Sequence, residues 1–181
     1  MTQRWIPTAH REDRLYNRSL AFLDGQGIKQ DQVAAFTLNA EAAERGHHDA
    51  VLAMGWFYLN GVGVEKDREK SWYWYRKSAR QGDPRAMFSL GYLCCIEGDY
   101  IEANKWFSRA IDAGHKRSLY WLAKSLWKGR GIEQDAKRAR SLIEQAAKAN
   151  VVEAKRALRF LSRSKSNKPL NVRQHVKHAA H

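Results

Sequence analysis

The chain has 181 residues, of which 44% are hydrophobic, and it carries a net charge of +13. This length and composition predict one folded domain with a sizeable core. No run of about eighteen apolar residues is present, which excludes a membrane-spanning helix, and the N-terminal stretch lacks the apolar segment of a secretory signal. The two cysteines, Cys94 and Cys95, are neighbours. We therefore expect reduced thiols in the cytoplasm and no structural disulfide.

The positive charge is concentrated in the second half of the chain. Residues 1–90 hold 13 Lys and Arg against 11 Asp and Glu, whereas residues 91–181 hold 19 against 8. This asymmetry predicts an acidic partner for the C-terminal half. Charge alone leaves open whether that partner is a protein, a nucleic acid or an anionic lipid.

Two glycine markers divide the chain into repeats. A Gly-x-Gly doublet begins at Gly25, Gly61 and Gly129, and a second marker recurs at Gly46, Gly82, Gly114 and Asn150 with steps of 36, 32 and 36 residues. The short step coincides with a third unit that lacks the doublet. Self-similarity at such a period is typical of solenoids. We predict an N-terminal extension over residues 1–12, repeats over 13–48, 49–84, 85–116 and 117–152, a capping helix over 151–162, and a basic tail over 163–181.

The second repeat predicts two helices, over residues 49–60 and 68–81. The glycine doublet ends the first of them, so it does not follow a strand as a phosphate-binding loop would. In the aromatic run, Tyr73 is expected to be exposed, and Trp74 and Tyr75 are expected to pack between repeats as core residues. Trp72 fits either role, and its exposure is left open.

These residues resemble the Sel1-like repeat, a relative of the tetratricopeptide repeat. The matching positions in the second unit include Ala50, Gly55, Tyr58, Trp74 and Tyr75. The first, third and fourth units depart from the pattern at some of these positions. The resemblance covers about residues 13–162 and implies an all-α, right-handed solenoid of stacked helix pairs. It also implies an interaction scaffold or adaptor, and it brings no catalytic residues.

The resemblance further implies that the first helix of each repeat lines a concave groove. Aromatic and basic side chains recur at the inward positions, and such side chains are concentrated at the centres of protein interfaces. The alternative is that several of the aromatics only pack between repeats. The predicted partner-binding residues are Tyr16, Leu52, Trp56, Arg85, Phe88, Tyr92, Arg117, Tyr120, Lys124, Trp127, Lys128 and Arg156.

The function we expect is a non-enzymatic, cytoplasmic adaptor that holds an acidic protein segment in this groove. A bacterial immunity or chaperone-like factor that masks an acidic protein is a sharper form of the same hypothesis. The alternative is a nucleic-acid-binding protein that uses the basic half. No catalytic or cofactor site is predicted, because no Ser/His/Asp arrangement, paired carboxylates or Cys/His metal spacing stands out. The histidines of the tail, His175, His178 and His181, are not predicted to bind a metal, because a chain terminus lacks the supporting shell of a real metal site. The sequence leaves the oligomeric state open.

Overall fold

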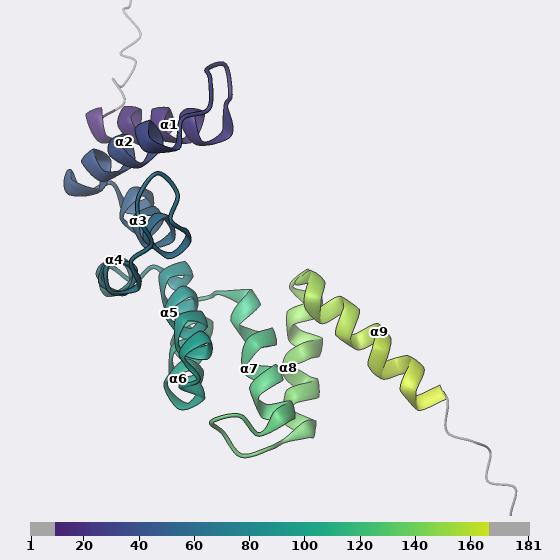
Figure 1. The fold of residues 1–181 in the computed structure, drawn as a ribbon. Helices are drawn as coiled ribbons and strands as arrows, with labels where there is room; N and C mark the ends of the chain where they lie inside the picture. The colour runs from purple at the N-terminus through teal and green to yellow at the C-terminus, as the bar shows by residue number, and fades with distance from the viewer. Residues whose placement is uncertain (1–9, 167–181) are drawn as a thin grey trace, which may run out of the picture.

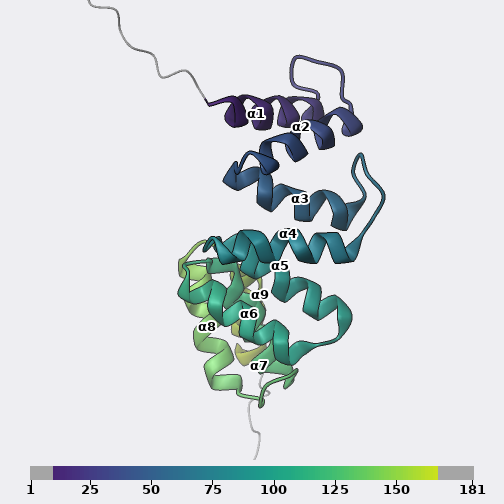
Figure 2. The same cartoon turned by 90° about the vertical axis from the view of Figure 1, so that its left-hand side faces the viewer.

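The structure is a computed structural model that describes residues 10–166, and within this range it contains nine α-helices and no strand (Figure 1). Each helix packs against the helices that precede and follow it. The two ends of the described chain lie at opposite ends of the array in both views (Figures 1 and 2). The helices are α1 (Arg11–Asp24), α2 (Gln32–Glu44), α3 (His48–Asn60), α4 (Arg68–Arg80), α5 (Pro84–Glu97), α6 (Tyr100–Asp112), α7 (Lys116–Lys128), α8 (Ala136–Lys148) and α9 (Val152–Ser166).

The predicted all-α array of four helix pairs with a final helix is confirmed, with pairs α1–α2, α3–α4, α5–α6 and α7–α8. No helix in the described range is both long and apolar enough to cross a membrane. The predicted N-terminal extension lies mostly outside the described residues. The predicted tail lies outside them beyond Ser166, up to which α9 continues.

The same local signals begin and end equivalent helices. The second helix of every pair begins after an aspartate whose carboxylate accepts a backbone N–H of the first turn, which satisfies an otherwise unpaired donor. These caps are Asp31, Asp67, Asp99 and Asp135. The first helix of each pair ends at a glycine in the left-handed region. The glycine doublets predicted this end for α1, α3 and α7, whereas α5 ends at the single Gly98. Asn150, at the equivalent of Gly82 and Gly114, is the one non-glycine residue with positive φ in the described range (φ 65°).

Two helical glycines allow aromatic rings to fill the core between the helices of a pair. A Cβ added at Gly55 would lie 2.5 Å from the ring of Tyr75, and one added at Gly91 would lie 2.6 Å from the ring of Phe107. Both rings are buried. Burial raises the pKa of Tyr75 to about 12. The glycines are therefore required where the opposite helix presents a ring, since an ordinary carbon contact needs about 3.5–4 Å.

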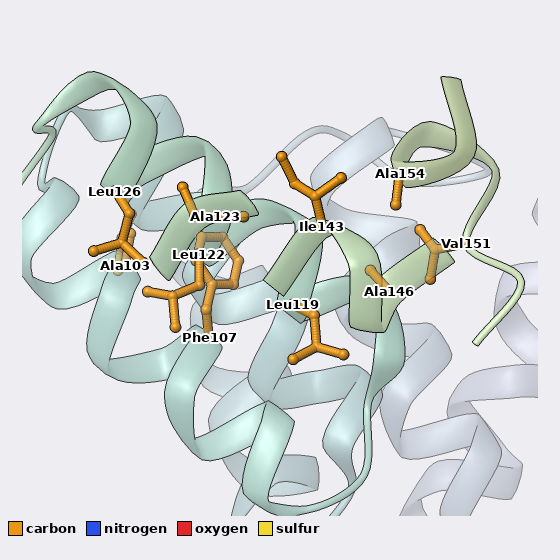
Figure 3. Packing of buried hydrophobic residues seen from close by; sticks show 12 residues of the cluster. Ala103, Phe107, Leu119, Leu122, Ala123, Leu126, Ile143, Ala146, Val151 and Ala154 are labelled. Carbon is orange, nitrogen blue, oxygen red and sulfur yellow. The ribbon is translucent and has the colours of Figure 1, made fainter. Parts of the chain in front are cut away.

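In the fourth repeat, different residues fill the core between the two helices of the pair. Ala123 and Ile143 stand at the positions of the glycine and the ring, and both belong to a buried cluster that spans α5 to α9 (Figure 3). Val151 and Ala154 extend this cluster onto the final helix.

The prediction that Trp74 is a core residue needs correction. Tyr75 is buried, whereas Trp74 is only half-buried and lies against the cluster of the first two repeats, with the ammonium of Lys77 4.6 Å from its ring centre. The second aromatic of the pair enters the core because it faces Gly55, and the first lies beside it at the edge. Tyr73 is exposed, as predicted.

Candidate binding surface

Three hollows follow one another along the surface formed by α1, α3, α5, α7 and α9, which we call the first-helix face. The N-terminal hollow, of about 290 Å³, is lined by residues of α1, α3 and α5 that include Tyr16, Leu52 and Trp56. The middle hollow, of about 210 Å³, lies where α5 and α7 approach and includes Tyr92 and Trp121. The C-terminal hollow, of about 250 Å³, is lined by α7, α8 and α9.

Exposed aromatic side chains lie in each hollow. Trp56, Tyr92 and Trp127 retain 40%, 40% and 39% of their surface. Phe160 of α9, in the C-terminal hollow, retains 74%. Side chains of this size are costly to leave in water, and their grouping along one surface is typical of an interaction site.

An ion-pair network lies at the N-terminal hollow, which Asp49 and Arg85 line. The guanidinium of Arg85 donates to Asp83 at 2.7 Å and to Asp49 at 2.5 Å, and so links α3 to α5. The Asp83 side chain is 1% exposed, and it is also 3.2 Å from the ring of His48. Burial raises the pKa of Asp83, but hydrogen bonds from Arg85 outweigh burial and hold the pKa below its ordinary value. Arg85 is therefore committed to contacts within the chain.

A second ion pair repeats this arrangement at the other end. Arg117 donates to Glu153 at 2.5 Å, and the two residues are separated by the same 36 positions as Asp49 and Arg85. Hydrogen bonds from its own backbone and from Arg117 hold the pKa of Glu153 below its ordinary value, although desolvation raises it. The guanidinium of Arg117 also lies 5.7 Å from the ring centre of Phe88. Arg117 thus ties the fourth repeat to the capping helix.

Three cations near the end of α7 are not paired with a carboxylate of the described range. Lys124, Lys128 and Arg130 are exposed, and none of them forms an ion pair with any residue of the described range. Lys124 lies 4.9 Å from the ring centre of Trp121, and Arg130 lies 5.2 Å from that of Tyr100. The face is consequently most electropositive around the middle and C-terminal hollows.

The structure separates the twelve predicted binding residues into two groups. Nine line the three hollows: Tyr16, Leu52, Trp56 and Arg85 in the N-terminal one, Tyr92 and Lys124 in the middle one, and Tyr120, Lys124, Trp127 and Lys128 in the C-terminal one. Phe88, Arg117 and Arg156 line none of them. Phe88 is half-buried against Phe107, His115 and Trp121, and Arg156 is exposed on α9.

Two of the predicted aromatics pack between repeats. Tyr16 stacks on His47 of the next repeat with ring centres 4.4 Å apart, and Phe88 lies 4.7 Å from the ring centre of His115. Burial, followed by the charge of Asp49, raises the pKa of Tyr16. Burial and the nearby Arg117 lower the pKa of His115 and so favour its neutral form. For these two aromatics, packing between repeats accounts for much of their contact surface.

Sequence reasoning missed Trp121 and Arg130, which line the middle hollow. The positions equivalent to Trp121 in the other first helices hold Asn17, Ala53 and Ser89, so comparison of the repeats predicts a small residue there. The usable signal was the Trp121–Lys124 spacing of three, which places a cation over an aromatic ring on one side of a helix.

A larger hollow, of about 840 Å³, is lined by α4, the C-terminal end of α5 and the start of α6. In the loop of the second repeat, Gly63 lies so close to the start of α2 that an added Cβ would overlap the backbone of α2. In the loop of the fourth repeat, Gly131 lies similarly close to the start of α6. The third repeat has only Gly98 and Asp99 between its helices, so the start of α4 receives no such loop. Trp72 is half-buried in this hollow, and its indole N–H donates to Glu97 at 2.9 Å.

The repeat geometry agrees with a comparison against known families. The Sel1 repeat model matches residues 15–47, 48–83, 84–115 and 116–151. The chain belongs to the Sel1 repeat family. Sel1 repeats are typical of scaffolds for protein–protein interaction, and the family is generally non-enzymatic.

Relatives of this Sel1 repeat chain occur among fungal and bacterial proteins. It is 34% identical over 83 residues to chitin synthase regulatory factor 4 of Schizosaccharomyces pombe, which is 45% of this chain and 13% of that protein. It is 32% identical over 111 residues to the Sel1-repeat-containing protein YjcO of Escherichia coli, which is 58% of this chain and 44% of that protein. A solved Sel1 repeat protein from Oxalobacter formigenes superposes with a TM-score of 0.75 at 30% identity, over 83% of this chain and 63% of that one. The chain thus spans less than two thirds of each of these relatives.

Proposed function

We propose that this chain is a non-enzymatic adaptor whose first-helix face binds an acidic segment of a protein partner. The observation that carries the proposal is the combination of exposed aromatics with cations that have no ion-pair partner in the described range. Trp127 and Tyr92 are exposed next to Lys124, Lys128 and Arg130. Aromatic side chains that become buried on binding supply affinity, and surrounding charges of one sign orient a protein segment of opposite charge.

The relatives support an adaptor over an enzyme. Several curated relatives are named regulators of chitin synthase, and regulation through contact with another protein suits a scaffold. Masking of an acidic effector protein, in the manner of an immunity or chaperone-like factor, is one form of this activity and uses the same face. We place the activity in the cytoplasm, where the free thiols of Cys94 and Cys95 stay reduced.

A photo-crosslinking experiment tests the proposal. Benzoylphenylalanine replaces Tyr92 on the first-helix face in one variant and Tyr73, which is 60% exposed on α4, in a matched control. After irradiation in native lysate, we expect protein adducts from position 92 that are absent from position 73. Adducts only from position 73, or none from position 92, would refute a binding role for this face.

Nucleic acid is the second candidate, because unpaired cations beside exposed rings also suit phosphates and stacked bases. The experiment separates it from a protein partner. Adducts at position 92 that disappear on nuclease treatment identify nucleic acid, whereas adducts that persist and yield peptides identify a protein. Retention of the unmodified chain on heparin across a salt series gives an independent measure of the non-specific contribution.

A further inference from the structure

The middle and C-terminal hollows share one wall. Lys124 lines both of them, with Tyr92 and Trp121 on one side and Trp127 and Phe160 on the other. The two hollows differ sharply in chemistry although they are adjacent. A single partner segment that crosses α7 would therefore meet two different environments in succession.

The middle hollow has the properties of a carboxylate site. Lys124 and Arg130 both line it, and no acidic residue does. Burial raises the pKa of the Cys95 thiol in this hollow, and the charges of Lys124 and Arg130 are near enough to offset part of that rise. Each cation lies over an aromatic ring, Trp121 for Lys124 and Tyr100 for Arg130, which restricts its position. An entering carboxylate would accept hydrogen bonds from two positioned cations, and such charge-assisted bonds are among the stronger ones.

The C-terminal hollow has the properties of a pocket for one apolar side chain. Most of its lining residues are aromatic or aliphatic, and Lys124 and Lys128 are the only charged residues that line it. The apolar and aromatic members are Tyr120, Trp127, Ile143, Ala157, Phe160 and Leu161. Its volume of about 250 Å³ lies below the range of about 300–1,000 Å³ that drug-sized ligands occupy, so it suits a side chain better than a cofactor.

Resting on the proposed function, we propose that these two hollows recognise an acidic residue and a bulky apolar residue of one extended protein segment. The acidic residue enters between α5 and α7, and the apolar residue enters between α7 and α9. The two hollows lie on either side of α7, so they are separated by about one helix diameter, about 10 Å, and an extended chain advances about 3.3 Å per residue. The two residues are therefore separated by about three positions.

Labelled synthetic peptides test this pairing by fluorescence anisotropy. The probes are twelve-residue Gly-Ser peptides that carry one Glu and one Leu at separations of one to six positions, with Glu→Gln and Leu→Ser versions of each. We expect the tightest binding at a separation of about three. Replacing Glu by Gln should weaken that binding about five-fold, as expected for two partly exposed charge contacts.

Variants of the chain then assign each peptide residue to its hollow. In Lys124→Gln/Arg130→Gln, the Glu and Gln peptides should bind equally, while the effect of Leu→Ser persists. In Phe160→Ser, the Leu and Ser peptides should bind equally, while the effect of Glu→Gln persists. The control Lys137→Gln/Arg138→Gln removes the same charge from exposed positions of α8 that line neither hollow. It should behave like the wild type.

Three outcomes would overturn the pairing. They are no binding by any peptide, no dependence on separation, and equal losses in Lys124→Gln/Arg130→Gln and in the control, which would indicate attraction by net charge alone. Each of them would leave the photo-crosslinking result at Tyr92 intact. Failure of the two-hollow pairing is thus distinguishable from failure of the proposed adaptor function. Circular dichroism of each variant serves as the control for folding.

Discussion

The glycine–ring contact in the third repeat provides a quantitative test of how the helices pack. In Gly91→Ala, the new Cβ would lie 2.6 and 2.7 Å from two ring carbons of Phe107 and 3.2 Å from the carbonyl oxygen of Ala103. The ring is fully buried, so it has no open space to enter, and the backbone of α6 limits any shift of the helix. An overlap of about 1 Å in a filled core typically costs about 1–3 kcal/mol.

Helix propensity acts in the opposite direction. Alanine is favoured over glycine within a helix by about 1 kcal/mol. Because the ring is fully enclosed, we expect the overlap to cost about 2–3 kcal/mol, the upper part of that range, so the free energy of unfolding should fall by a net of about 1–2 kcal/mol. For a chain of this size, that change corresponds to a melting temperature lower by about 3–6 °C. Urea and thermal denaturation followed by circular dichroism measure both quantities.

The fourth repeat provides the compensating substitution. Phe107→Ile alone should cost about 1–2 kcal/mol through a cavity, but together with Gly91→Ala it reproduces the Ala123 and Ile143 pair of the fourth repeat. The double variant should therefore be more stable than the sum of the single effects predicts, by about 1–2 kcal/mol. Additivity within about 0.5 kcal/mol, or a Gly91→Ala variant that is more stable than the wild type, would refute the packing argument.

Three further predictions concern charge and thiol chemistry. Arg85→Glu should lower the free energy of unfolding by about 2–3 kcal/mol in urea denaturation, because buried Asp83 loses its partner. Lys124→Glu should change the free energy of unfolding by less than about 0.5 kcal/mol. Equal effects of the two substitutions would contradict the view that Arg85 is paired and Lys124 is not. Folding lowers the pKa of Asp83, so the contribution of its carboxylate to the free energy of unfolding is complete above about pH 4 and is lost as pH falls through the lowered pKa. The stabilities of the wild type and Asp83→Asn should therefore converge in acid. A stability difference that stays constant down to about pH 2 would contradict this prediction. Burial raises the pKa of Cys94 to about 12, so iodoacetamide at pH 8 should label half-buried Cys95 first by mass spectrometry; earlier labelling of Cys94 would argue against its burial.

The fold was predictable because its determinants are local and recur. Glycines that end helices, aspartates that cap them and alternating small and large apolar residues act within one helix pair, and the spacing of 36, 32 and 36 residues then orders the pairs. Which aromatic side chain of residues 72–75 enters the core could not be predicted from these local signals. Trp74 and Tyr75 are adjacent and both large, and only the facing Gly55 decides that Tyr75 is buried.

The first-helix face was only partly predictable, because charge pairing between repeats decides which cations remain available. From the sequence alone, Arg85, Arg117 and Lys124 look equivalent, and charge reversal at all three would be expected to leave stability unchanged. The structure shows instead that the first two are paired with Asp49, Asp83 and Glu153. A signal was present, since Asp49 and Arg85 occupy the same position in successive repeats.

The pairing also changes how the charge of the C-terminal half is understood. The net charge of +11 over residues 91–181 predicted an acidic partner for the C-terminal half. On the first-helix face, however, Arg117 is paired with Glu153 at the equivalent position of α9, so the fold itself neutralises one of these cations. Lys124, Lys128 and Arg130 lie a turn or more beyond these paired positions, at the end of α7 and in the loop that follows. On the function proposed above, a few placed cations beside exposed rings would select an acidic partner on this face, and total charge would contribute mainly to the rate of encounter.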